Sequence, residues 1–133
     1  MSTFRYSPTV ESASSVDGFV QLISLVEGKT VLGTARWHAP SAARGAAQIL
    51  DLTVVETHRR QGVGGRLLRE TMSQIAKYFR VRVAKPRRVW ISVEQKSQIN
   101  ARAFLTQHGF HHVATINNLL ARQDALIYLK AFD

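Results

Sequence analysis

The hydrophobic and polar positions of the chain first divide it into short strands. Residues 19–26 and 30–37 are rich in apolar and β-branched residues and flank the turn Glu27-Gly28-Lys29. This pattern predicts a β-hairpin. A further apolar segment, residues 49–55, predicts a strand that ends just before a glycine-rich stretch, residues 59–65.

Two segments instead carry apolar residues at helical spacing. Counted from Leu68, these residues recur at i, i+4, i+7 and i+11, which predicts a helix over about 64–78. A second helix is expected from an N-cap at Ser97 to His108, with Gly109 as a left-handed stop. Its expected buried stripe consists of Ile99, Ala103 and Phe104.

The remaining segments complete one domain. Residues 89–93 form a strand between the two helices, and residues 111–116 and 125–132 form a closing pair. The small, polar residues 8–17 predict a loop after a short first strand. A strand-helix-strand crossover implies parallel neighbours. We therefore expect a single α/β (α+β) domain over residues 1–133, with a mixed, mostly antiparallel sheet of six or seven strands and two main helices.

Composition narrows the class of protein. With 45% hydrophobic and 20% charged residues the chain is globular, and it contains no apolar run of the length that spans a membrane. The absence of cysteine excludes disulfides, thiolate metal sites and a cysteine nucleophile. The histidines lack metal-ligand spacing, so no metal is expected. The first residues lack the apolar core of a secretory signal, and we expect a cytoplasmic location.

The net charge of +9 is unevenly distributed. Residues 59–102 hold twelve Lys or Arg against Glu70 and Glu94, so the whole surplus lies there. Such a segment attracts anionic ligands or a nucleic-acid backbone, or it is simply a solvated basic face. Nucleic acid is the least favoured partner, because nothing resembles an aromatic-studded RNA-binding sheet.

The stretch Arg59-Arg60-Gln61-Gly62-Val63-Gly64-Gly65 lies between a predicted strand and a predicted helix. Backbone N–H groups at a helix N-terminus lack intrahelical partners, and the helix dipole adds positive potential there. Glycine lets a phosphate approach the backbone closely. The pattern lacks the Lys-Ser/Thr ending of an ATP or GTP loop. It predicts a site for a phosphorylated small molecule.

Two motifs resemble those of the GNAT family of acetyltransferases. Residues 51–68 resemble its acetyl-CoA-binding motif, Arg/Gln-x-x-Gly-x-Gly/Ala, which is met by Arg59, Gly62 and Gly64. Residues 100–110 resemble the later helix of the family, which ends in Gly-Phe. The resemblance covers about residues 19–132. It implies the GNAT fold and acetyl-CoA as the acetyl donor.

The resemblance also implies roles for individual residues. The strand backbone would pair with the pantetheine arm, the amides from Arg60 to Gly65 would hold the pyrophosphate, and Asn100 or Gln98 would contact the donor. The basic segment would meet the 3′-phosphate. In the family the donor lies in a V-shaped opening between strands 49–55 and 89–93, where an amide near Val54 or Val55 polarises the acetyl carbonyl. The implied donor-binding residues are Leu52, Thr53, Val54, Arg59, Arg60, Gln61, Gly62, Val63, Gly64, Gly65 and Asn100.

Acetyl transfer to nitrogen needs a neutral amine, and hence a base or a water relay. Asp51 is the leading candidate, because a carboxylate on a mostly apolar strand is costly unless it is paired. Strict alternation places Asp51 on one face with Ile49 and Thr53. The alternative is a structural partner for an arginine or a loop amide. Glu94 and Glu56, at strand ends, are the other candidates.

One departure from the family concerns the proton donor. Many members carry a tyrosine directly after the Phe104 position, and its hydroxyl protonates the leaving thiolate of coenzyme A. Here that position is Leu105. Thr106, His108 or a water could substitute. Otherwise Leu105 belongs to the core, and the protein is a catalytically weak or inactive acetyl-CoA-binding regulatory module.

A second departure concerns the acceptor. The family usually has two helices between its first and second strands, and residues 7–18 leave no room for them. The shortened helical region leaves the acceptor side open, or completed by a second subunit in a homodimer. An open groove suits a protein or peptide amine, and a dimer-completed pocket suits a small molecule. We expect direct acetyl transfer to a primary amine of an unidentified acceptor.

Overall fold

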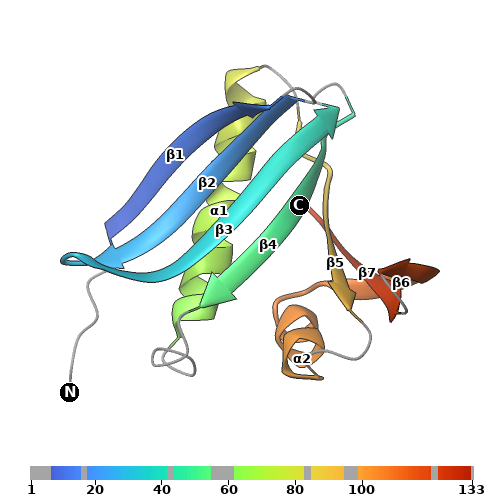
Figure 1. Ribbon diagram of the computed structural model, residues 1–133. Helices are drawn as coiled ribbons and strands as arrows, with labels where there is room; N and C mark the ends of the chain where they lie inside the picture. Colours follow the sequence, from blue (N-terminus) through green and yellow to red (C-terminus); the bar gives the residue numbers. More distant parts are fainter. Residues whose placement is uncertain are drawn as a thin grey trace.

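A seven-stranded sheet organises the chain in the computed structural model (Figure 1). The structure describes residues 7–15, 18–41, 44–54, 62–82, 85–94, 99–120 and 123–132. The strands are β1 (Ser7–Ser15), β2 (Gly18–Glu27), β3 (Thr30–Ser41), β4 (Ala46–Val54), β5 (Arg88–Glu94), β6 (His111–Leu120) and β7 (Gln123–Ala131), in the order β1-β2-β3-β4-β5-β7-β6. The helices are α1 (Val63–Val81) and α2 (Ile99–Gln107).

The sheet is mixed, as the sequence predicts. Strands β1 to β4 pair antiparallel, β4 and β5 pair parallel, and β5, β7 and β6 pair antiparallel. The parallel pair brackets α1, which is the crossover that connects β4 to β5. The predicted hairpin is β2 and β3, joined by Gly28 and Lys29 with Gly28 at φ 61°.

The prediction of a loop over residues 8–17 is wrong. Residues 7–15 form β1, which pairs with β2 in nine consecutive registered pairs from Ser7 and Val26 to Ser15 and Gly18. Small, polar residues have low intrinsic strand preference, but an edge strand needs only backbone pairing along its neighbour, which β2 supplies. Pro8 is compatible with this place because β1 lies at the edge of the sheet. Only two residues connect β1 to β2, so no helix separates them.

The core lies between α1 and one face of the sheet. Leu67, Ile75 and Phe79 of α1 are fully buried against the apolar face of β2, β3 and β4. Trp37 of β3 packs edge-on against Tyr78 of α1, with ring centroids 5.3 Å apart. Figure 1 shows α1 behind these strands, and no described helix covers the opposite face.

Helix α2 lies on the same side of the sheet as α1. Ile49 faces α1 and is registered with Ile91, which is registered in turn with Tyr128, so these three side chains lie on the same face of the sheet. The Tyr128 hydroxyl accepts a hydrogen bond from Arg102 of α2. The helix ends as predicted, with Gly109 at φ 88° and the Phe110 N–H donating to the Leu105 carbonyl at 2.9 Å.

The inward face of α2 differs from the predicted one. Ala103 is exposed, whereas Leu105 is only 4% exposed and belongs to the core. Ala101 and Phe104 are partly buried against the same core. The nine-residue helix packs against α1 as well as the sheet, and this second contact sets which side faces inward. The predicted N-cap, Ser97, lies outside the described residues.

Candidate functional site

An opening between β4 and β5 is the first component of the site. The parallel register runs only from the pair Ala46 and Arg88 to the pair Ile49 and Ile91. Both strands continue, to Val54 and Glu94, and Figure 1 shows them diverging toward α2. The backbone of β4 beyond Ile49 therefore lines a V-shaped gap. This is the segment whose backbone the sequence predicts to hold the pantetheine arm.

A β-bulge lies where the two strands separate. Trp37 is registered with Ile49 and Arg36 with Asp51, so Leu50 is an extra residue on β4. Because of this bulge, the prediction that Asp51 shares a face with Ile49 is wrong, whereas Thr53 does lie on the face of Asp51, as predicted. Ile49 is buried on the α1 face with Trp37, whereas Asp51 pairs with Arg36 on the opposite face. A single inserted residue breaks the two-residue alternation on which the prediction rested.

Asp51 forms an ion pair at this bulge. Its Oδ2 atom lies 2.6 Å from Nε and 2.5 Å from Nη2 of Arg36, and the two side chains are 37% and 54% exposed. The hydrogen bond to Asp51, followed by its charge, raises the pKa of Arg36. The arginine partner that the sequence offered as an alternative role for Asp51 is therefore present. The backbone of Glu94 ends β5 on the other arm of the gap.

The N-terminus of α1 is the second component. Gly62 is the N-cap in the left-handed region at φ 79°, with no side-chain cap, and the first turn carries no acidic residue. A Cβ at Gly62 would meet no atom of the described residues within 4 Å, apart from its neighbours along the chain, so no described element covers this turn. Amide groups of the first turn lack intrahelical acceptors and point outward. Arg59, Arg60 and Gln61 lie outside the described residues, as do Val55, Glu56 and Gln98.

Gly64 and Gly65 have a packing role that the sequence did not reveal. A Cβ at Gly64 would lie 3.4 Å from the Phe104 ring of α2 and 3.7 Å from Cγ2 of Val54. A Cβ at Gly65 would lie 3.2 Å from Cε1 of His108. The missing side chains let α2 pack directly on the first turn of α1. Asn100 lies in the first turn of α2.

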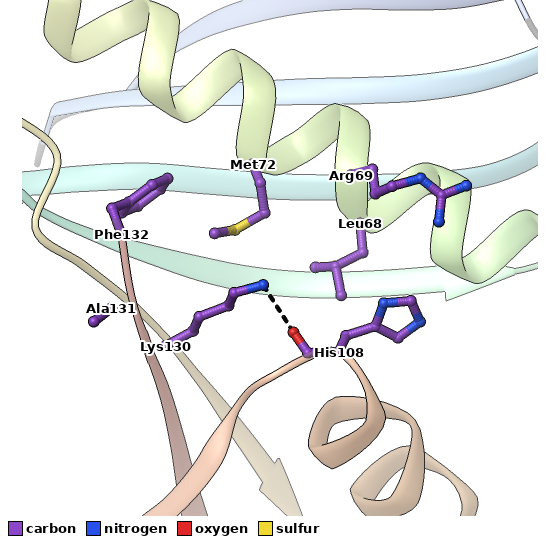
Figure 2. Close-up of a pocket in the computed structure, with 7 residues that line it drawn as sticks. All are labelled: Leu68, Arg69, Met72, His108, Lys130, Ala131 and Phe132. Atoms are coloured by element: carbon purple, nitrogen blue, oxygen red, sulfur yellow. Dashed lines mark hydrogen bonds between the residues drawn. The ribbon is translucent and has the colours of Figure 1, made fainter.

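An open pocket of about 270 Å³ lies next to this helix contact (Figure 2). Leu68, Arg69, Met72, His108, Lys130, Ala131 and Phe132 line it. Lys130 donates a hydrogen bond from Nζ to the His108 carbonyl at 2.9 Å. Burial, then the charges of Arg69 and Lys130, lower the pKa of His108. The sequence did not single out Arg69 or Lys130, because they are separated along the chain and meet only in the fold.

Leu105 packs in the core, and its side chain contains no proton donor. A buried hydroxyl lies nearby on another element. Tyr128 of β7 is registered with Ile91, the last β5 residue paired to β4. It is 3% exposed, and its oxygen is 3.2 Å from Nε of Arg102. The backbone of Tyr128 therefore lies one strand away from the point where the gap opens, and its hydroxyl contacts α2.

The described residues contain no group of three or more side chains able to hold a metal ion. Among the helices in the described ranges, none is long and apolar enough to cross a bilayer.

Solved structures with a similar fold include acetyltransferases, at low sequence identity to this chain. An IAA acetyltransferase from Bacillus cereus has a TM-score of 0.75 at 12% identity, with 95% of this chain and 100% of that chain covered. The ribosomal-protein-S18-alanine N-acetyltransferase from Escherichia coli has a TM-score of 0.70 at 16% identity, with 94% of each chain covered.

The third is a GNAT family acetyltransferase from Elizabethkingia anophelis with acetyl-CoA bound, at a TM-score of 0.70 and 14% identity over 94% of this chain and 98% of that chain. No curated protein sequence matches the chain. The family model described as "Acetyltransferase (GNAT) family" matches residues 5–110, which include the gap, the glycine turn and α2. The chain belongs to the GNAT family of acetyltransferases, for which acetyl-CoA is the acetyl donor.

Proposed function

We propose that this protein transfers an acetyl group directly from acetyl-CoA to a primary amine. The observation that carries this proposal is the β4–β5 gap leading to the open glycine N-terminus of α1. A thioester can enter between diverging strands while its pyrophosphate is held at the helix N-terminus. The gap alone or the helix N-terminus alone would suit many ligands. The gap and the helix N-terminus together suit a long donor with an anionic centre.

In this proposal the donor is held mainly by backbone. Leu52, Thr53 and Val54 lie on the arm of β4 that lines the gap, where they pair with the pantetheine arm. The amides from Arg60 to Gly65, including Val63, hold the pyrophosphate, and Asn100 contacts it from α2. Arg69 is a described cation close to this turn, with Nη1 3.4 Å from the position of a Cβ on Gly65. It is placed to meet a phosphate of the donor.

The amine is proposed to approach from the face opposite α1. Both helices occupy one side of the sheet, and the other side presents partly exposed side chains around the bulge. There the His38 ring lies 2.8 Å from the Gln48 amide oxygen, and Gln48 is registered with Trp90. Asp51 lies on this face. An exposed sheet face accommodates a protein or peptide amine.

The chemical step forms a C–N bond and breaks the C–S bond of the thioester. The ammonium loses one proton to Asp51 or to a water held by Asp51, and Glu94 is the alternative acceptor. The amine nitrogen then attacks the carbonyl carbon, and coenzyme A leaves as a thiolate. The nitrogen, now part of the protonated amide, releases its second proton, which replaces the proton that the thiolate takes up. Because Leu105 has no proton to give, we assign protonation of the thiolate to the Tyr128 hydroxyl. Tyr128→Phe is expected to lower kcat and leave acetyl-CoA affinity unchanged.

A catalytically weak acetyl-CoA-binding module is the second candidate. It is favoured by the burial of Leu105, which removes the usual proton donor. If Leu105→Tyr creates turnover that the parent lacks, this candidate gains support. Robust turnover by the parent removes it.

A second copy of the chain is the alternative way to complete the acceptor site. Edge strand β6 carries no Lys, Arg, Asp or Glu, and it exposes Val113, Ile116 and Leu119 by 54%, 43% and 54%. An uncharged, apolar edge lets two strongly basic chains approach each other there. The homodimer would suit a small-molecule amine.

Donor binding tests the proposal most directly. Gly62→Glu places a carboxylate at the pyrophosphate position without a steric clash in the free protein. Gly28→Glu is the matched control, because Gly28 has a similar φ of 61°, equally open surroundings and a remote position in the β2–β3 turn. Calorimetry should show acetyl-CoA binding to the parent and to Gly28→Glu and none to Gly62→Glu. Normal binding by Gly62→Glu would refute the donor site, and a panel of amines then tests transfer.

A further inference from the structure

Seven of the described basic residues gather at the end of the molecule opposite the glycine turn. Three elements contribute them: the last turns of α1, the β3–β4 connection and the segment that enters β5. Figure 1 shows these three elements together at one end of the sheet, and α2 at the other end. We name this cluster the basic end. Its members are Arg44, Lys77, Arg80, Arg82, Lys85, Arg87 and Arg88.

Backbone hydrogen bonds hold this cluster together. The Gly45 carbonyl accepts from the N–H groups of Arg87 and Arg88, at 2.8 and 3.1 Å. This contact fixes Arg44 beside the start of β5. Arg82 is held on α1, with its Nη1 donating to the Tyr78 carbonyl at 3.2 Å and its guanidinium 3.6 Å from the Tyr78 ring centroid. The cluster is therefore built on fixed backbone.

All seven side chains of the basic end are exposed, and none forms a salt bridge to a carboxylate within the described residues. Of the described carboxylates, Asp51 pairs with Arg36, and Glu70 pairs with Arg66 on an earlier turn of α1. Glu27 and Asp124 lie at the opposite ends of their strands from this cluster. The cations keep their charge available for an external anion.

The acetyl donor does not account for the basic end. At 1.5 Å per residue, α1 separates Gly62 from Arg80 by about 27 Å along its axis. A donor whose pyrophosphate is at Gly62 and whose thioester is in the β4–β5 gap does not extend toward Arg80. The family resemblance implied that the basic segment meets the 3′-phosphate of the donor, but the fold places most of the described charge of that segment at the far end.

The composition of the basic end favours one kind of partner. Five of the seven cations are arginines, whose planar guanidinium groups bind phosphate oxygens in pairs. Val81 is the single large apolar residue exposed in this region of the described structure, which is too little for a membrane-inserted face or the apolar centre of a protein interface. The Tyr78 ring is already covered by Arg82 and does not offer that face to a base.

We propose that the basic end binds the sugar-phosphate backbone of a nucleic acid, without reading its sequence. The sequence alone ranked nucleic acid last among partners, because it offers no aromatic surface. Backbone binding needs no such surface, only closely spaced exposed cations. The basic end supplies these on a rigid frame, away from the acetyl transfer site.

Salt dependence of binding provides the test. A fluorescein-labelled DNA duplex and a single-stranded RNA, each of about 20 nucleotides per strand, are titrated with the full chain between about 50 and 200 mM salt. About five neutralised phosphates give a slope of log K against log salt near −4.5 for the duplex, which is roughly a 500-fold loss over this range. A slope shallower than about −1 would overturn the proposal.

Charge variants locate the surface. Arg87→Gln with Arg88→Gln should reduce the slope by about 2, because two phosphate contacts are lost. Lys29→Gln with Arg66→Gln removes the same charge elsewhere and should leave the slope within about 0.5 of the parent value. Equal weakening by both pairs would mean that net charge alone attracts the polyanion, and the proposal fails. Acetyl-CoA affinity, measured by calorimetry, should be unchanged in the Arg87/Arg88 variant and shows that it is folded.

Anionic vesicles address the competing partner. Vesicles of phosphatidylcholine and phosphatidylserine are sedimented with the protein at matched phosphate concentration and salt. Weaker binding to vesicles than to either nucleic acid supports the proposal. Stronger binding to vesicles overturns it in favour of a membrane surface. Binding to nucleic acid or to vesicles does not depend on acetyl transfer. The proposal for the basic end can therefore be refuted while the proposed acetyltransferase function stands.

Discussion

Replacing Asp51 by asparagine separates a catalytic carboxylate from a structural one. The change keeps the size of the side chain and removes its charge, which breaks the ion pair with Arg36. These side chains are 37% and 54% exposed, so solvent screens the pair and its contribution to stability is below about 1 kcal/mol. If Asp51 accepts the proton of the amine, kcat/KM should fall about 100-fold or more. A large loss of kcat/KM with only a small loss of stability would therefore identify Asp51 as a catalytic residue.

The assay measures thiol release from acetyl-CoA with the best amine of the panel, together with urea unfolding of the same samples. Glu70→Gln is the matched control, because it neutralises the carboxylate of the Arg66–Glu70 ion pair on α1, away from the β4–β5 gap. It should cost about the same small amount of stability and leave kcat/KM unchanged. Full activity of Asp51→Asn would refute the assignment and leave Asp51 as a structural partner of Arg36.

Arg36→Gln provides an independent check on the same ion pair. Removing the guanidinium takes away the partner that orients Asp51, so kcat/KM should fall if Asp51 accepts the proton of the amine. Urea unfolding of the same sample shows that the variant is folded. Unchanged kcat/KM in Arg36→Gln would indicate that another group, such as Glu94, accepts the proton.

Three further predictions concern stability and assembly. Gly45→Ala should lower the free energy of unfolding, measured by urea denaturation, by about 3 kcal/mol or more, because Gly45 has φ 66° and its Cβ would overlap the Lys85 carbonyl oxygen. Gly28→Ala should lower it by only about 1 kcal/mol, because the space around Gly28 is open. Because the folded pKa of His108 is lowered, the unfolded state binds more protons. The free energy of unfolding should therefore fall as the pH drops through about 6.5 in the parent, and more gently in His108→Gln. Ile116→Lys should abolish self-association in sedimentation equilibrium, and a parent that stays monomeric at high concentration would rule out the dimer.

Features that depend on neighbours along the chain followed from the sequence. The spacing of Leu68, Met72, Ile75 and Phe79 specified α1, because an α-helix repeats every 3.6 residues and its inward face must be apolar. The stop at Gly109 also followed, because glycine adopts a left-handed conformation without a Cβ clash. The position of the glycine turn before α1 also followed from the sequence, because it depends only on residues that are neighbours along the chain.

Features that depend on distant residues required the tertiary structure. Strand β1 forms because β2 offers it a complete set of backbone partners, although its own side chains are poor strand formers. The extra residue Leu50 becomes visible only in the register between β3 and β4, and it reverses the face of Asp51.

The basic charge shows the same division most clearly. The sequence determined how many cations the segment 59–102 carries and that a glycine turn lies within it. It could not determine which of these cations lie near that turn, because α1 carries the chain about 27 Å away before β5 begins. The fold decided that the glycine turn and most of the described basic charge lie at opposite ends of the protein, since a rigid helix separates them.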